Sequence, residues 1–355
     1  MDSSQSNSNG APVLVSAVSK LTLTGEESVE APDSGSVLLP PHLSHDPQTN
    51  LKRSDPFQFG SRHLSEKDNV FEFNAWDHVE TDDIYKEYAE QQFAKQREAP
   101  VSDFDKTRFN SDPAKWWNNF YKNNTANFFK DRKWLQQEFP VLSEMTKADA
   151  GPVTLLEVGA GAGNTAFPIL AHNHNPNLKI HACDFSKNAV EVIRANESYD
   201  TKNIQADVWD VAGDELPPGL EEASVDHVLM IFIFSALSPS QWKQAVHNIF
   251  KVLKPGGEVL FRDYGRGDLA QVRFKKGRYL EENFYIRGDG TRVYFFEKDE
   301  LIDIWTGEIA EESGASFEVV DLGVDRRLLV NRAKQLKMYR CWLQGRFRKQ
   351  QNQTP

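Results

Sequence analysis

Cysteine is scarce in this sequence, because 355 residues contain only Cys183 and Cys341, which lie far apart. A disulfide framework and a cysteine-ligated zinc site both need more cysteines at closer spacing, so we expect neither, and no metal. No apolar run reaches the roughly 20 residues that a membrane-spanning helix needs, so we expect no membrane association and a soluble protein. The N-terminus carries acids and no Arg-rich amphipathic stretch, which argues against a mitochondrial presequence and favours the cytoplasm.

An overall excess of basic residues is also missing. The chain has 41 Lys and Arg against 52 Asp and Glu, a formal net charge of −11. This balance excludes a uniformly basic nucleic-acid binder, although it allows a local basic face.

The two ends of the chain have little that could build a core. Residues 1–69 are rich in Ser, Pro, Asn and Asp. Such a segment buries too little apolar area to offset its backbone entropy, so we predict a disordered tail there and a disordered C-terminus at 350–355.

Aromatic residues return in the segment 70–150, which we predict to be a helical cap. Asp112 and Pro113 are typical of a helix start, and Trp117, Phe120 and Tyr121 then recur three to four residues apart on one face. These rings either pack on the domain that follows or cover a cofactor or RNA.

Three glycines follow the apolar run 153–158 at alternate positions, namely Gly159, Gly161 and Gly163. A strand, a tight turn and a helix start are expected, since glycine accepts positive φ and lets a ligand approach the backbone. A dinucleotide-binding turn would need a further glycine where Asn164 stands. With Glu157 before them, the glycines resemble the first motif of S-adenosylmethionine-dependent methyltransferases. A plain turn in an α/β domain is the alternative.

From residue 151 the strand-like and helix-like segments alternate, which predicts a doubly wound α/β sheet. We expect a Rossmann-like, seven-stranded class I methyltransferase domain over 151–349. Its strands are expected at 153–158, 178–184, 204–208, 226–234, 258–264, 317–322 and 337–347, and its helices at 186–196, 240–253 and 296–313, with a basic insertion at 265–292.

Acidic residues stand at the ends of two expected strands. Asp184 is placed to accept hydrogen bonds from both ribose hydroxyls of a nucleoside, and Asp207 to accept one from an adenine amino group. The backbone of Val208 can meet the adenine ring, and Ile231 can wall the ligand. The carboxyl ends of neighbouring strands converge on one crevice, so we expect these residues to form a cofactor site.

Two further absences narrow the chemistry. An Asn/Asp-Pro-Pro-aromatic sequence, typical of methyl transfer to exocyclic amines, is missing after residue 230, and no cysteine lies near the expected strands 226–234 and 258–264. Thiolate activation of a pyrimidine ring is therefore disfavoured. A ring nitrogen remains a suitable acceptor, because its lone pair needs mainly positioning, and a carboxylate such as Asp263 would stabilise the cationic product.

Longer stretches resemble one family. Trp-Trp-Asn-Asn-Phe-Tyr-Lys at 116–122, Asn-Phe-Phe-Lys-Asp-Arg at 127–132, Phe-Arg-Asp-Tyr-Gly at 261–265 and the segment 282–292 are similar to the tRNA N3-methylcytidine methyltransferases that modify cytidine 32 of the anticodon loop. The opening 73–79 is similar to the branch acting on threonine tRNAs. The resemblance implies an S-adenosylmethionine-dependent enzyme. It places cofactor contacts at Trp117, Tyr121, Gly159, Asp184, Asp207, Val208 and Ile231, and the glycine turn adds Gly161 and Gly163.

Contact with tRNA needs positive charge despite the acidic total. Residues 323–349 contain nine basic side chains and one acid, and a second basic cluster lies in 265–292. Placed in loops after sheet strands, these clusters favour a phosphate track over a merely solvated face. The residues expected to bind the anticodon arm are Phe128, Phe129, Lys130, Arg132, Arg266, Arg340, Arg346 and Arg348.

Two other functions remain open: a methyltransferase of this fold that acts on a protein or a small molecule, and a catalytically silent interaction subunit. Neither accounts for the basic clusters together with the intact glycines and strand-end acids. An aminoacyl-tRNA synthetase or another accessory protein also stays open as a partner.

Overall fold

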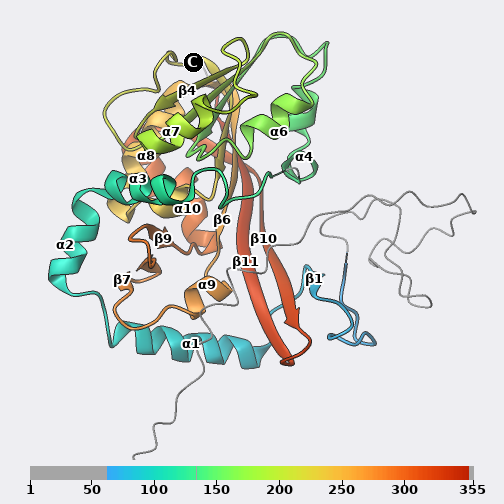
Figure 1. Cartoon of the computed structure of the whole chain (residues 1–355), viewed down its shortest axis with the longest axis vertical. Coiled ribbons are helices and arrows are strands. Elements are labelled where there is room, and N and C mark those ends of the chain that lie inside the picture. Colours follow the sequence, from blue (N-terminus) through green and yellow to red (C-terminus); the bar gives the residue numbers. More distant parts are fainter. Residues whose placement is uncertain (1–61, 133, 352–355) are drawn as a thin grey trace, which may run out of the picture.

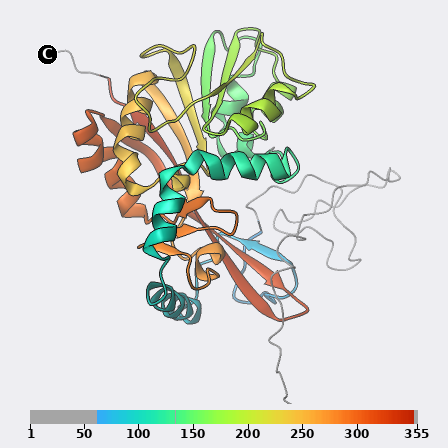
Figure 2. The same ribbon diagram turned by 60° about the vertical axis from the view of Figure 1, so that its left-hand side comes forward.

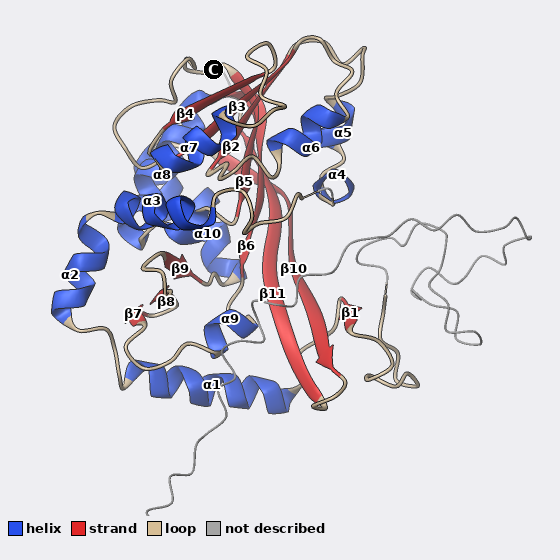
Figure 3. Cartoon of the chain, in the orientation of Figure 1, coloured by secondary structure: helices blue, strands red, loops and turns tan. Residues whose placement is uncertain are grey.

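Eight strands form one twisted sheet at the centre of the molecule (Figures 1 and 3). The computed structural model describes residues 62–132 and 134–351, so the predictions for 1–61 and 352–355 lie outside the described residues. The order across the sheet is β1-β10-β11-β6-β5-β2-β3-β4. The bounds are β1 (Ala75–Asp77), β2 (Val153–Val158), β3 (Leu178–Asp184), β4 (Ile204–Val208), β5 (Val225–Ile231), β6 (Leu253–Tyr264), β10 (Phe317–Asn331) and β11 (Leu336–Lys349).

Strands β4, β3, β2, β5 and β6 run parallel, and β11 pairs antiparallel with both β6 and β10. These seven strands confirm the seven-stranded, Rossmann-like sheet expected from the sequence. The eighth, β1, adds to the edge through the pairing of Ala75 with Leu329. The parallel strands all end at one edge of the sheet, and a ligand site is expected there.

Two sequence expectations differ from the structure: the length of the last two strands of the sheet, and the residue at which the N-terminal tail ends. Strand β10 extends to Asn331, far beyond the expected 317–322, and β11 slightly exceeds the expected 337–347; together they form a hairpin that projects beyond the other strands (Figure 1). Residues 62–69, assigned to the tail, join the folded part: the backbone N–H of Arg62 donates to Asp77 Oδ2 at 3.2 Å, and its Nη1 donates to the Ala75 carbonyl.

Helices cover both faces of the sheet because successive strand residues point to opposite sides. Leu155 packs in one buried cluster with α4, α5, α6 and α7, and Leu156 packs in another with α8, α10 and α11. The helix bounds are α1 (Asp83–Arg97), α2 (Asp103–Ser111), α3 (Pro113–Asn124), α4 (Leu135–Glu138), α5 (Val141–Glu144), α6 (Ala166–Ala171), α7 (Lys187–Arg194), α8 (Pro239–Val252), α9 (Leu269–Val272), α10 (Lys298–Thr306) and α11 (Glu308–Ser313), with a 3₁₀ turn η1 (Phe234–Ala236). Within the described ranges, none of these helices is long and apolar enough to cross a bilayer.

Local signals placed several helix ends correctly. Asp112 caps α3 by accepting from the Lys115 N–H at 3.1 Å, with Pro113 in the first turn, and Ser186 caps α7. A single helix was expected over 296–313. The structure has two, α10 and α11, because the helix is interrupted at Gly307.

The basic insertion 265–292 has its own structure. It contains α9 and, with the next strand, a three-stranded sheet made of β7 (Tyr279–Glu281), β8 (Phe284–Ile286) and β9 (Arg292–Tyr294). In the turned view of Figure 2, the teal helix α3 crosses the middle of the molecule between the green strands above and this orange insertion below. The cap and the insertion therefore meet beside the edge where the parallel strands end.

Candidate active site

The glycine turn between β2 and α6 lies at the carboxyl edge of the sheet. Gly159, Gly161 and Gly163 all have positive φ, at 67°, 59° and 82°. A Cβ on Gly159 would stand 2.3 Å from Cγ1 of Ile233, and one on Gly161 would stand 2.5 Å from the Tyr121 hydroxyl. The turn therefore needs glycine for both its backbone conformation and the close approach of its neighbours.

Asp184, the last residue of β3, is tied to this turn. Its Oδ2 accepts from the Gly161 N–H at 2.8 Å and its Oδ1 accepts from the Ser186 N–H at 2.8 Å. Burial raises the pKa of this carboxyl group to about 6, although both hydrogen bonds favour the charged form. A carboxylate is thus held at the crevice, oriented by two backbone donors.

Helix α3 covers the turn and the start of α7. Asn118 Oδ1 accepts from the Ser186 hydroxyl at 2.9 Å, and the Asn118 carbonyl accepts from Asn188 Nδ2 at 2.8 Å. These bonds hold Trp117 and Tyr121 over the crevice, and the two rings stack with centroids 6.3 Å apart. Hydrogen bonds of Asn118 therefore hold the cap on the crevice, in addition to the packing of its aromatic residues.

The segment after α3 is bonded to the same turn through Asn164. The Asn164 side chain donates to the Phe129 carbonyl and to Asp131 Oδ1, both at 3.2 Å, and the Asn164 backbone carbonyl accepts from the Arg132 N–H at 2.8 Å. Arg132 Nη1 also donates to the Thr165 hydroxyl at 3.1 Å. Arg132, which the sequence analysis expected to bind tRNA, thus lies in the wall of the crevice.

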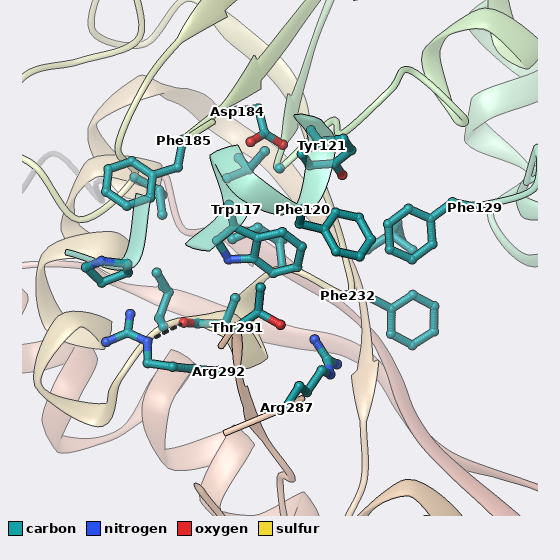
Figure 4. A pocket seen from close by; sticks show the side chains of 18 of the residues that line it. Trp117, Phe120, Tyr121, Phe129, Asp184, Phe185, Phe232, Arg287, Thr291 and Arg292 are labelled. Atoms are coloured by element: carbon teal, nitrogen blue, oxygen red, sulfur yellow. Dashed lines mark hydrogen bonds between the residues drawn. The ribbon is translucent and has the colours of Figure 1, made fainter. Parts of the chain in front are cut away.

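A cavity of about 240 Å³ opens where these elements meet (Figure 4). The cap contributes Trp117, Phe120, Tyr121, Phe128, Phe129 and Arg132; the strand ends contribute Val158, Gly159, Asp184, Ile231, Phe232 and Tyr264; the insertion contributes Arg287, Asp289, Thr291 and Arg292. In this view Asp184 lies at one end of the cavity, Arg287 at the other, and Trp117 between them. The walls are mostly aromatic and apolar, with a few polar groups, as in a site for a flat heterocyclic ligand.

Glu157, which precedes the glycine turn, is buried beneath the site. Its Oε1 lies 4.0 Å from Arg132 Nη1. Burial raises the pKa of this carboxyl group to about 7, against the attraction of the arginine. A positively charged ligand bound near the glycine turn would favour the ionised form of this carboxyl group.

Asp207 and Val208 lie outside the lining of the cavity. Asp207 accepts from Arg194 Nη2 at 2.9 Å and from Gln205 Nε2 at 2.7 Å, and the Val208 side chain is exposed. The residues that line the cavity after β4 are Trp209, Asp210 and Val211.

Asp263 also does not line the cavity. It is completely buried, and it accepts from the Ser235 N–H at 2.9 Å and from its neighbour's N–H, that of Tyr264, at 2.8 Å. Burial raises the pKa of its carboxyl group to about 6. Its contacts make Asp263 a positioning residue, which fixes the turn after β5 and the backbone of Tyr264, both parts of the cavity wall.

The basic residues expected to hold RNA have acidic partners inside the protein. Arg266 pairs with Glu90 at 2.7 Å and also lies near Glu282 and Glu297, and Arg340 pairs with the fully buried Asp268 at 2.8 Å. These arginines fasten α1 and α9 to the body of the molecule.

Arg346 and Arg348 both pair with Glu258 at 2.8 Å. Both arginines lie on strand β11, whereas the sequence analysis placed this basic cluster in a loop after a strand. Because β11 is antiparallel to β6, Trp342 lies beside Tyr264 at the cavity edge, whereas Arg348 lies beside Glu258 near the opposite edge. The antiparallel direction of this strand carries them away from the cavity.

Comparison with known proteins identifies the enzyme class of this chain. A family profile described as a methyltransferase domain matches residues 156–259, from within β2 into β6. The sheet order, the glycine turn and the strand-end Asp184 agree with that match. The fold and the site define an S-adenosylmethionine-dependent methyltransferase.

Curated relatives then define the family. The tRNA(Thr) (cytosine(32)-N(3))-methyltransferase of Saccharomyces cerevisiae is 53% identical over 301 residues, which are 84% of this chain and 47% of that protein. The tRNA N(3)-methylcytidine methyltransferase trm140 of Schizosaccharomyces pombe is 51% identical over 291 residues, 82% of this chain and 92% of that protein. The Mettl2 protein of Drosophila melanogaster is 43% identical over 300 residues. The chain spans about half the length of the S. cerevisiae relative. It belongs to the tRNA N3-methylcytidine methyltransferase family.

Proposed function

We propose that this protein transfers a methyl group from S-adenosylmethionine to N3 of cytidine 32 in the anticodon loop of threonine tRNAs. The single observation that carries the proposal is the cavity. It has at one end Asp184, a carboxylate placed to bind ribose hydroxyls, and its aromatic walls leave room for a base. The names of the relatives supply the target nucleotide and the tRNA.

The residues present fit the cofactor. Gly159 lines the cavity, Asp184 offers a carboxylate to ribose hydroxyls, and Tyr121 and Trp117 would cover the ligand from above. Gly161 and Gly163 do not line the cavity; Gly161 serves the site by leaving room for Tyr121 and by donating its N–H to Asp184. When bound, S-adenosylmethionine supplies an electrophilic methyl group on a positively charged sulfur. The buried carboxylates of Glu157 and Asp184 favour a cation in this part of the protein.

The far end of the cavity would receive the base. Phe128 is 57% exposed at the mouth, although its ring packs edge-on against Phe120 at 4.9 Å. Phe232 and Tyr264 also line the cavity, with their ring centroids 4.9 Å apart. A splayed loop base gains stacking energy between such rings, and cytosine N3 needs no enzyme nucleophile, because its lone pair is already available.

The phosphates of the anticodon arm require cations near the mouth. Lys122 and Lys130 are exposed on the cap, and neither forms an ion pair or hydrogen bond within the described residues. Arg332 and Lys334 lie at the tip of the projecting β10–β11 hairpin, where Lys334 is exposed. The Arg332 guanidinium donates to the Glu72 carbonyl at 3.2 Å. We therefore assign the phosphate contacts to Lys122, Lys130 and Lys334, in place of Arg266, Arg340, Arg346 and Arg348.

A tRNA substrate favours the cytoplasm as the place of action. The test is methyl transfer by the purified full chain to a threonine tRNA transcript, with and without the matching aminoacyl-tRNA synthetase. Nucleoside mass spectrometry should detect N3-methylcytidine at position 32, and a transcript with uridine there should gain none. Absence of N3-methylcytidine from every tRNA in both arms would overturn the proposal and favour a protein or small-molecule substrate.

A further inference from the structure

A five-residue turn between β8 and β9 brings two opposite charges into the base end of the cavity. Arg287 and Asp289 both line the cavity, and no ion pair joins them. Arg287 has no acidic partner within 4.0 Å among the described residues, and its guanidinium lies 5.6 Å from the centre of the Tyr264 ring.

The turn is rigidly built. The Arg287 N–H donates to the Thr291 carbonyl at 2.8 Å, and the Gly290 N–H donates to the Arg287 carbonyl at 3.1 Å. Gly290 has a φ of 86°, and a Cβ there would stand 2.2 Å from the Trp116 ring, so α3 packs directly on the turn. Both charged side chains therefore start from a backbone that the cap holds in place.

Only one oxygen of Asp289 has a structural role. Oδ1 accepts from the Thr291 N–H at 2.9 Å and from the Thr291 hydroxyl at 2.7 Å. Oδ2 accepts no hydrogen bond from any described residue, although the side chain belongs to the cavity lining. Asp289 is exposed, so Oδ2 is available to a hydrogen-bond donor of a bound ligand, and its negative charge would repel a phosphate.

We infer that this turn selects cytosine: Asp289 Oδ2 accepts from the exocyclic amine and Arg287 donates to O2, on either side of N3. The inference rests on the proposed function. Cytosine presents a donor at position 4 and an acceptor at position 2, and so matches a carboxylate and a guanidinium. Uracil presents an acceptor at both positions, so its O4 would face Asp289, and its N3 carries a proton.

Asp289→Asn is an informative change because it preserves the turn. The amide oxygen can accept from Thr291 as Oδ1 does now, which leaves the NH₂ group in the place of Oδ2. The variant then presents a donor where the protein presents an acceptor. A purely structural Asp289 would tolerate this change, whereas a residue that reads the base would not.

The experiment measures binding of two synthetic anticodon arms, with cytidine or uridine at position 32, to the full chain saturated with S-adenosylhomocysteine. We expect the unchanged protein to prefer the cytidine arm by about tenfold, and Asp289→Asn to reduce the ratio to about one or invert it. Asp299→Asn, on the exposed first turn of α10, serves as the matched control and should keep the original ratio.

Methyl transfer by the unchanged protein separates the two levels of the argument. If the unchanged protein forms N3-methylcytidine but Asp289→Asn keeps the cytidine preference, the selection by this turn is wrong and the proposed function stands. If the unchanged protein neither prefers the cytidine arm nor methylates it, both are wrong.

Discussion

Replacing Gly161 with alanine tests how closely the cap approaches the glycine turn. The new Cβ would stand 2.5 Å from the Tyr121 hydroxyl oxygen, while the next atom of that ring, Cζ, lies at 3.4 Å. Positive φ at an alanine costs about 1–2 kcal/mol, and the overpacking against Tyr121 adds about 1–3 kcal/mol. We therefore expect Gly161→Ala to lower the free energy of unfolding by about 2–5 kcal/mol and to weaken binding of S-adenosylhomocysteine at least tenfold.

Two variants separate the strain from the contact. Gly151 also has positive φ, 75°, but nothing lies within 4 Å of its Cβ position, so Gly151→Ala should show the backbone cost alone and unchanged ligand affinity. Tyr121→Phe removes the one atom inside 3.0 Å, so Gly161→Ala combined with it should recover most of the overpacking cost. Urea unfolding and calorimetry measure both quantities. Equal losses for Gly161→Ala and Gly151→Ala, or no recovery in the double variant, would refute this account of the cap.

Three further changes test separate parts of the site. Asn118→Ala should weaken S-adenosylhomocysteine binding about tenfold, because α3 loses its hydrogen bonds to the start of α7. The control Asn124→Ala, on the same helix, should leave the affinity unchanged. Calorimetry measures both, and equal affinities of the two variants would contradict the role of Asn118. Burial raises the pKa of Asp184 to about 6, and protonation removes a hydrogen-bond acceptor, so ligand affinity should fall as the pH is lowered through 6. Asp184→Asn should lose this pH dependence. Identical pH profiles of the two proteins would contradict the role of Asp184. Lys130→Ala should reduce by about one the slope of log affinity for tRNA against log salt concentration. Lys202→Ala, which precedes β4 at the end of the sheet away from the cavity, should leave this slope unchanged. Equal slopes in filter binding would contradict the phosphate contact of Lys130.

Local sequence signals predicted most of the fold. Alternating apolar runs predicted the seven main strands, and the glycine turn with Asp184 predicted where they would form a site. The caps Asp112 and Ser186 were readable because each makes a bond to a residue three positions along the chain.

Long-range pairing was not readable from local signals. The charge cluster at 323–349 suggested a phosphate track, but a strand's direction decides which edge of the sheet its residues reach. Arg346 and Arg348 thus lie with Glu258 far from the cavity. Pairing with Leu329 likewise added β1 to the sheet, although its three residues carry no strong strand signal.

The base end of the cavity was missed for a similar reason. Arg287 and Asp289 stand in a stretch that is noticeable only for its basic charge, and they reach the site because the insertion packs against α3 through Gly290 and Trp116. Asn164 stood out only as a missing glycine, yet its side chain fastens the segment 129–132 to the turn.

The most direct test of the central claim is nucleoside mass spectrometry of threonine tRNA from cells that lack this protein. We predict that N3-methylcytidine at position 32 is lost, that the unchanged gene restores it, and that an Asp184→Ala gene expressed at the same level does not. Undiminished N3-methylcytidine in the deletion cells, or full restoration by Asp184→Ala, would contradict the account.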